Sequence, residues 1–399
     1  MQQTLSYVMV TPYTIAKSRT GGVIARLLSR LDLELVGAQI LAPDEAFVRE
    51  YALSIRSQGD PNTPEGAKLL ADYVERHFAP SEGRKHRALL LLFRGDEPCR
   101  KLSDICGALY PENKSIESIT GETIRDTYAD LIMSSDEPPR VSYFEPAVLT
   151  PRRQEWADRN LSFFSRFLTG QENIVENLKY PDPAKIERTL VIIKPDNWQY
   201  ASSKPGTIID MFSRTGLRIV GIKVHRFSLA EALEFYGPVE TALIDKLASS
   251  FGNRAREILE KEFNISLSKH TAKVLTENFG IECAKDQFRQ IIEFMSGIKP
   301  ESCPVEEIHN PGSVKCMILV YEGEGAIEKI RDVLGPTDPL KAPGGTVRRE
   351  FGSNVMINTA HASDSPENAN REMAIVKVNH NSMGEIISAY LSLKQKGVQ

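Results

Sequence analysis

Residues 211–224, MFSRTGLRIVGIKV, join the end of a predicted amphipathic helix to a β-branched segment that predicts a strand. The stretch LLSRLDLELVGAQI at 27–40 repeats this pattern position by position, including its Ser-Arg pair and its Val-Gly pair. Two segments with the same order of apolar, charged and glycine positions indicate two copies of one structural unit.

Three further pairs of segments keep the same order and extend the repeat over most of the chain. They are TLSYVMVTPYT (4–14) with TLVIIKPDNWQ (189–199), RALLLLFRG (87–95) with KCMILVYEG (315–323), and GETIRDTY (121–128) with GGTVRREF (344–351). Each copy reads as strand, helix, strand, helical stretch, strand, short helix and strand. This order predicts an α+β fold with two ferredoxin-like (βαββαβ) domains, each an antiparallel sheet with helices packed on it.

The repeat also predicts where the chain divides. Residues 1–150 form the first copy, 151–187 a helical connector and linker, and 188–399 the second copy. The second copy carries an insertion at about 240–311, where TALIDKLASSF and NRAREILEKEF are helical in pattern. The insertion ends in GIKPESCPVEEIHNPG, whose prolines and glycines predict a surface loop.

Composition narrows the class of protein. A chain of 399 residues with 41% hydrophobic and 26% charged residues is typical of a soluble protein with two or three domains. A net charge of −4 gives no reason to expect nucleic-acid binding. The five cysteines lack metal-binding spacing, and no apolar run is long enough for a signal peptide or a membrane span. We therefore expect a cytoplasmic protein with free thiols.

The segment MINTAHASDSPENA places His361 just before a predicted helix start. Pro366 suits the first helical turn, and Ser365 or Asp364 suits the N-cap. The free N–H groups of a helix N-terminus favour phosphate. Glu372, about two turns into the helix, could bind one ring nitrogen and leave the other as a nucleophile. A histidine at such a position is more often a surface or capping residue, so the segment alone does not decide its role.

Several residue types that bind phosphate lie upstream of this segment. Arg331 is on a predicted short helix, and the loop LGPTDPLKAPGGTVRR after it contains Thr337 and Arg348. Lys194 ends the first strand of the second copy. Each residue alone is most simply a solvated or structural side chain. The predicted fold brings all of them to one edge of the sheet, which favours a phosphate site.

The second copy resembles the nucleoside diphosphate kinase family in RTLVIIKPD, GTIIDMFSRTGLRIVGIKV, IRDVLGPTDPLKAPGGTVRREF and NVMINTAHASDS. The signature Asn-x-x-His-x-Ser-Asp in the last segment is specific. The resemblance implies an enzyme that transfers the γ-phosphate of ATP to nucleoside diphosphates by a ping-pong mechanism through phospho-His361. Two alternatives stay open: a nucleotide-binding regulatory or scaffold protein with little turnover, and a donor of phosphate from His361 to another protein.

The resemblance also implies roles for individual residues. His361 would accept phosphate through Nδ1, Glu372 would hold the ring, and Tyr236 would support His361. Lys194 and Asn358 would bind the ribose hydroxyls, and Lys194 would also stabilise the transferred phosphoryl group.

Four further residues would contact the nucleotide. The resemblance assigns Arg331 and Thr337 to the β-phosphate, Arg348 to the γ-phosphate and Val355 to the base. Mg²⁺ would be held mainly by the nucleotide phosphates and water, because this ion keeps much of its hydration shell.

The second copy departs from the family in two places. A phenylalanine that stacks on the base in the family aligns with Gln287, and Phe288 stands beside it. The insertion at 240–311 falls where the family has a short helical hairpin over the nucleotide.

The first copy has lost the chemistry. Thr11 replaces the strand-end lysine, Ser103 replaces the arginine of the short helix, and only Arg125 is kept. In VSYFEPAVLTP, Glu145 stands where the histidine would be needed, so we expect a degenerate domain. Because family members assemble through dimers of this domain, the resemblance implies an internal pseudo-dimer, with further homo-oligomers possible. The alternative is two copies that are merely tethered.

Overall fold

The computed structural model describes residues 3–58, 64–109, 121–137 and 141–396, in which each copy forms a four-stranded sheet. Across the first sheet the order is β2 (Glu34–Leu41), β3 (Ala88–Gly95), β1 (Thr4–Val10) and β6 (Val148–Leu149). Across the second it is β8 (Arg218–His225), β9 (Cys316–Glu324), β7 (Ile186–Ile193) and β10 (Ala360–Ala362). In both sheets the first strand lies between the third and the fourth and is antiparallel to both. This is the predicted ferredoxin-like order.

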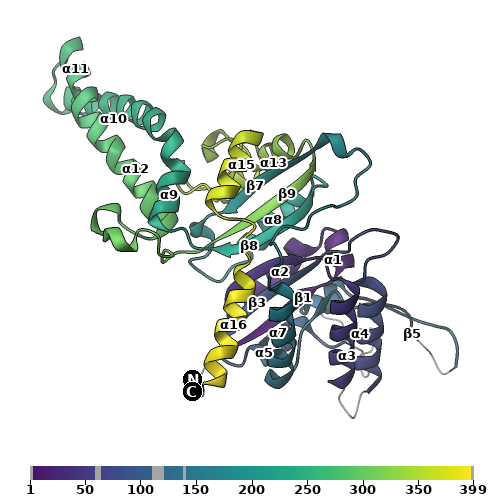
Figure 1. The fold of residues 1–399 in the computed structure, drawn as a ribbon. Helices are drawn as coiled ribbons and strands as arrows, with labels where there is room; N and C mark the ends of the chain where they lie inside the picture. The colour runs from purple at the N-terminus through teal and green to yellow at the C-terminus, as the bar shows by residue number, and fades with distance from the viewer. Residues whose placement is uncertain (1–2, 59–63, 110–120, 138–140, 397–399) are drawn as a thin grey trace. The chain divides into compact units, whose positions relative to one another are not determined.

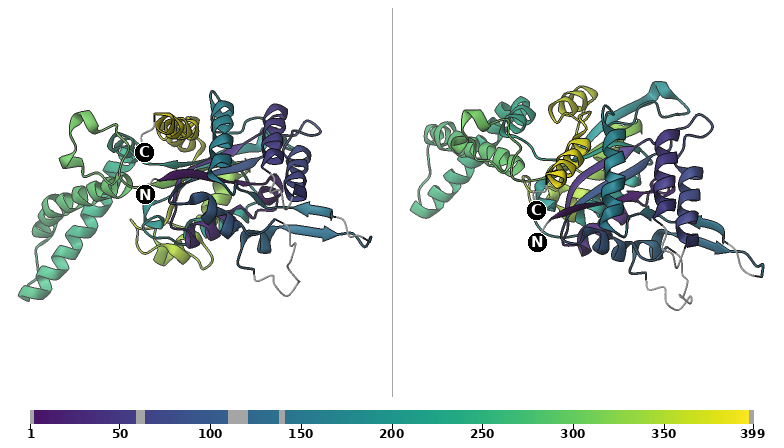
Figure 2. Two further views of the ribbon diagram at one scale, coloured as in Figure 1. Left: turned by 90° about the horizontal axis from the view of Figure 1, so that it is seen from below. Right: turned by 60° about the horizontal axis from the view of Figure 1, so that its bottom comes forward.

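Helices connect these strands. In the first copy they are α1 (Pro12–Ala16), α2 (Thr20–Arg30), α3 (Glu45–Ser57), α4 (Pro64–His77), α5 (Pro98–Cys106), α6 (Ile124–Tyr128) and α7 (Gln154–Leu168). In the second copy they are α8 (Lys204–Ser213), α13 (Ala326–Leu334), α14 (Val347–Phe351), α15 (Pro366–Ile375) and α16 (Ser382–Gln395). A two-stranded ribbon, β4 (Asp130–Met133) with β5 (Val141–Glu145), extends from the first copy (Figure 2).

The central strand β1 is buried on both faces. Leu5, Tyr7 and Met9 enter one core, and Val8 and Val10 enter the other, because side chains alternate along a strand. A strand covered by helices on both sides reads as a continuous apolar run, which is how LSYVMV reads.

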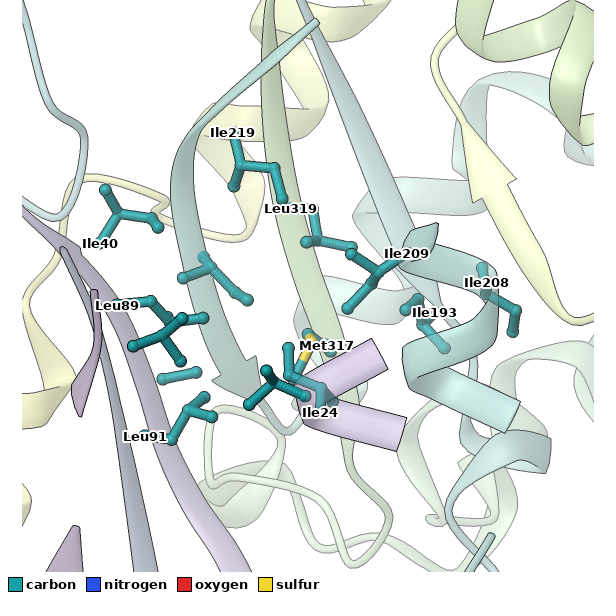
Figure 3. Close-up of a cluster of buried hydrophobic side chains, with 14 of the residues drawn as sticks. Ile24, Ile40, Leu89, Leu91, Ile193, Ile208, Ile209, Ile219, Met317 and Leu319 are labelled. Carbon is teal, nitrogen blue, oxygen red and sulfur yellow. The ribbon is translucent and has the colours of Figure 1, made fainter. Parts of the chain in front are cut away.

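The two copies share one of these cores. Its side chains come from both sheets and from the facing helices α2 and α8, as Figure 3 shows for Ile24, Ile208 and Leu319. The helices meet at Gly21 and Gly206, where a Cβ on either residue would lie within 2.5 Å of the other helix's backbone. Close approach of this kind requires glycine. Apart from residues 225–316 and 374–376, the two copies therefore form one compact unit and are more than tethered.

The other core, on the far face of the first sheet, is covered by α3, α4, α7 and α16. Helix α7, predicted as part of the connector, buries Phe163 and Phe164 in the first copy. Helix α16, the last in the chain, buries Met383 and Ile387 there and lies beside α7 (Figure 1). The first copy thus takes its cover from sequence well beyond residue 150.

Residues His225–Cys316, with Ala374–Val376, form a second compact unit. It contains α9 (Leu229–Tyr236), α10 (Glu240–Phe263), α11 (Lys269–Leu275) and α12 (Ile281–Ser296). The insertion is therefore helical, as predicted. Helices α10 and α12 pack along each other, and Gly280 approaches the carbonyl oxygen of Ala248 so closely that a Cβ would lie 2.3 Å away.

All five cysteines carry free thiols, as predicted. Within the described ranges, none of the helices combines the length and the apolar character that crossing a membrane requires.

Candidate active site

His361 is the central residue of β10, where it pairs with Ile192 of the neighbouring strand. Thr359 directly precedes this strand, and its φ of +75° is rarely adopted by a β-branched residue. Its carbonyl oxygen accepts hydrogen bonds from the Lys194 backbone N–H at 2.9 Å and from Asn197 Nδ2 at 2.8 Å. These bonds hold the backbone that presents the imidazole.

A buried carboxylate orients the His361 ring. Glu372 on α15 is 4% exposed, and its Oε2 lies 2.8 Å from His361 Nε2. Ser363 Oγ donates to the same carboxylate oxygen at 2.6 Å and is fully buried. A proton on Nε2 facing this carboxylate places the lone pair of the ring on Nδ1. Sequence reasoning found Glu372 but gave Ser363 no role, although it stands in the quoted signature.

Helix α15 begins beside the histidine, as the segment predicts. Ser365 Oγ accepts the backbone N–H of Asn368 at 3.1 Å, so Ser365 is the N-cap of the two candidates. Asp364 accepts a hydrogen bond from Asn368 Nδ2 at 2.7 Å, which lowers the pKa of its carboxyl.

Lys194 and Asn358 form the buried cationic part of the site. Lys194 is 8% exposed and donates from Nζ to Asn358 Oδ1 at 2.7 Å. Burial and, to a smaller extent, the nearby charge of Arg348 lower the pKa of Lys194 to about 8. Asn358 Nδ2 donates to the carbonyl oxygens of Val355 at 2.8 Å and Thr337 at 3.3 Å. Asn358 therefore joins the lysine to two loops that the resemblance assigns to the nucleotide.

Arg348 is also largely buried, at 9% exposure. Its Nη1 donates to the Gly335 carbonyl oxygen and its Nη2 to that of Ala360, both at 3.0 Å. Arg125 makes the equivalent bond to the Val148 carbonyl oxygen in the first copy, at 2.8 Å. This arginine therefore holds β10 in the second copy and its counterpart β6 in the first, a role that sequence reasoning missed when it assigned Arg348 only to phosphate.

The remaining predicted contacts lie at the surface of the same copy. Arg331 on α13 is exposed and lines a cavity of about 390 Å³ together with Asp364. Thr337 is exposed in the following loop, and Val355 is 54% exposed. These three residues are accessible to a ligand, whereas Lys194 and Asn358 are buried.

Two predicted features belong to the second compact unit. Tyr236 ends α9 there, so its assigned support of His361 stays a prediction. Phe288 is 5% exposed on α12, and its ring is therefore packed inside that unit. Gln287 beside it hydrogen-bonds Gln290 on the same helix.

The first copy shows which residue replaces the histidine. Leu149 pairs with Met9 in the register in which His361 pairs with Ile192. Glu145 lies four residues earlier, so the prediction that it stands in the histidine position is wrong.

Glu145 instead closes the degenerate site. Its carboxylate accepts hydrogen bonds from Thr11 Oγ1 at 2.8 Å, from the Ala147 backbone N–H at 3.1 Å and from the Tyr73 hydroxyl. Burial raises the pKa of this carboxyl. Thr11, which stands in the position of Lys194, therefore binds the Glu145 carboxylate of the protein itself.

Comparisons with known proteins concern the second copy. The family model described as nucleoside diphosphate kinase matches residues 187–244 and 239–382. A nucleoside diphosphate kinase of Anaeromyxobacter sp. is 31% identical over 188 residues, which are 47% of this chain and 87% of that protein. The enzyme of Bdellovibrio bacteriovorus is 31% identical over 195 residues, covering 49% and 95%. A solved NDP kinase from Pyrobaculum aerophilum is 28% identical, with a TM-score of 0.34, over 49% of this chain and all of that one. The identity and coverage of the Anaeromyxobacter and Bdellovibrio relatives show that the chain belongs to the nucleoside diphosphate kinase family.

Proposed function

We propose that the second copy transfers the γ-phosphate of ATP to nucleoside diphosphates, with His361 as the carrier. The observation that supports this most is the buried Ser363–Glu372–His361 chain, because it fixes the ring and directs the lone pair of Nδ1 outward. A carboxylate beside a nucleophilic histidine also stabilises the positive charge that the ring gains on phosphorylation.

The reaction proceeds in two symmetric steps. Nδ1 of His361 forms a bond to the γ-phosphorus while the bond from that phosphorus to the β,γ-bridging oxygen breaks, and ADP leaves. A terminal oxygen of the acceptor's β-phosphate then attacks the phosphohistidine, and the N–P bond breaks. Such a covalent intermediate gives ping-pong kinetics.

Charge neutralisation supplies the rest of the catalysis, because phosphoryl transfer depends mainly on positioning and electrostatics. Lys194 and Arg348 present buried cations, and Arg331 presents an exposed one. Glu372 already accepts two hydrogen bonds. This cationic donor set fits Mg²⁺ that is bound by the nucleotide phosphates and water, where the ion would neutralise phosphate charge.

Labelling with γ-³²P-ATP in the absence of an acceptor tests the proposal. We expect label that is labile to acid, stable to base and removed by adding GDP. A His380→Asn variant is the matched control, since His380 also pairs with a carboxylate, that of Glu385 at 3.0 Å, but lies outside the site. An unlabelled chain, or acid-stable label, contradicts the proposal. Stabilisation by nucleotide without label would support the regulatory alternative, which the buried Phe288 ring favours.

The lowered pKa of Lys194 predicts proton uptake when nucleotide binds. Near pH 8 the free lysine is about half protonated, and an adjacent phosphate raises its pKa, so ADP binding takes up as much as about half a proton. Affinity for ADP should fall as the pH rises above this value. Calorimetry at pH 8 in buffers of different ionisation enthalpy measures the uptake. Equal uptake by a Lys194→Met variant would show that another group is responsible.

A further inference from the structure

The first copy contains a cavity of about 510 Å³ at the place where the second copy carries its nucleophile. Leu149, which replaces His361 in the register of the sheet, forms part of its wall. The cavity is bounded by α3, α4, the end of β6 and the first turns of α7. Its size lies within the range of small-molecule sites.

The inner end of the cavity is neutral and provides hydrogen bonds. Asn160 stands eleven residues after Leu149, as Glu372 stands eleven residues after His361, and it is 1% exposed. Asn160 Nδ2 donates to the Tyr7 hydroxyl at 2.7 Å, and the Asn160 oxygen accepts from Ser54 at 2.5 Å. A neutral amide thus replaces the carboxylate of the active copy.

A pair of buried tyrosines leaves a donor for a ligand. The hydroxyls of Tyr7 and Tyr51, both in the cavity wall and each 1% exposed, lie 3.2 Å apart. One bond between them uses one of their two protons, so among the described residues the second hydroxyl proton has no acceptor. Burial raises the pKa of both phenols, which keeps them neutral donors. A ligand with a hydrogen-bond acceptor would satisfy this proton.

The outer end of the cavity is basic and aromatic. Arg152, Arg153 and Trp156 line it at the start of α7, and the two arginines are exposed. The Arg153 guanidinium lies 5.1 Å from the centre of the Trp156 ring. Among the described residues that line the cavity there is no carboxylate. This cavity is therefore neutral at its buried end and charged at its outer end, whereas the buried groups of the active copy are charged.

We propose that this cavity binds a nucleoside monophosphate, with the heterocycle inside and the phosphate at Arg152 and Arg153. The edge of a heterocycle offers the acceptors that Tyr7 or Tyr51 requires, and its faces suit the apolar wall that includes Leu149. Arginines bind a terminal phosphate through paired hydrogen bonds. Because Leu149 cannot be phosphorylated, the ligand is bound without turnover. This second site is independent of the proposed transfer at His361.

Calorimetric titration of the full chain with AMP, GMP, CMP and UMP tests the proposal. We expect at least one to bind, with affinity lowered about tenfold or more by Arg152→Glu and abolished by Ala67→Trp, which fills the cavity from α4. Arg159→Glu, an exposed charge reversal on the same helix away from the cavity, and Arg331→Ala, in the second copy, should leave this binding unchanged.

Two results would overturn the inference. One is that none of the four probes binds at about 1 mM. The other is that binding survives both Arg152→Glu and Ala67→Trp and is lost in Arg331→Ala, which would place it in the second copy. Thermal unfolding of each variant shows whether it is folded. If Ala67→Trp does not fold, the result for the surface variant Arg152→Glu decides whether the cavity binds the ligand. Labelling of His361 is measured separately, so either proposal can fail alone.

Discussion

A His361→Asn variant is expected to lose phosphotransfer by at least roughly 10⁴-fold. The asparagine amide has no nucleophilic lone pair, so no phosphorylated intermediate can form. Its side chain is close to imidazole in reach, and Glu372 and Ser363 remain to bind it. Steady-state transfer from ATP to GDP, with the chain at high concentration, measures the loss.

The same variant should still bind nucleotide, because Lys194, Asn358 and Arg331 are untouched. Stabilisation of the variant by ADP, measured by thermal unfolding, therefore separates lost chemistry from lost folding. A decrease of less than about tenfold in transfer would mean that another group carries the phosphate or that none does.

The second large effect concerns the contact between the copies. A Gly206→Ala variant is expected to lower the free energy of unfolding by about 3 kcal/mol or more. The added Cβ would lie 2.2 Å from the Ala25 backbone nitrogen and 2.4 Å from the Gly21 carbonyl oxygen. Backbone atoms cannot move aside as a flexible side chain can, so α2 and α8 must separate and loosen the shared core. Denaturant unfolding of the full chain measures the change.

Two further glycine variants serve as comparisons, one at this contact and one away from it. Gly21→Ala should destabilise similarly, because its Cβ would lie 2.4 Å from the Asp210 backbone nitrogen. Gly237→Ala should be nearly neutral, because nothing lies within 4 Å of the position. If Gly206→Ala unfolds at the same denaturant concentration as Gly237→Ala, the helix contact does not hold the copies together.

The elements that the sequence predicts well are those with local patterns. The aligned Val-Gly and Ser-Arg pairs predict two equivalent sheets, and the capping residues before Pro366 predict where α15 begins. The spacing from His361 to Glu372 predicts that the two residues can meet, because both positions follow from one strand and one helix.

Other features depend on packing between segments that are far apart in the sequence, so no local sequence pattern indicates them. The error at Glu145 arises because the β4–β5 ribbon ends at Glu145, so the counterpart of β10 begins only at Val148. Ala147, with a φ of +60°, stands in the position of Thr359. Nothing near Asn197 indicates that its amide will hold the Thr359 carbonyl. Helix α7 is amphipathic in sequence, but its apolar face does not say which copy it will cover.

Helix α16 has a consequence for the order in which the protein folds as it is synthesised. The first copy leaves the ribosome before the second, but Met383 and Ile387, which complete its far core, are translated long after residue 150. Domains of most proteins fold in turn as they emerge. Here the first copy keeps part of its apolar surface exposed until Ile387 has emerged, so it cannot complete its far core before most of the second copy has been synthesised.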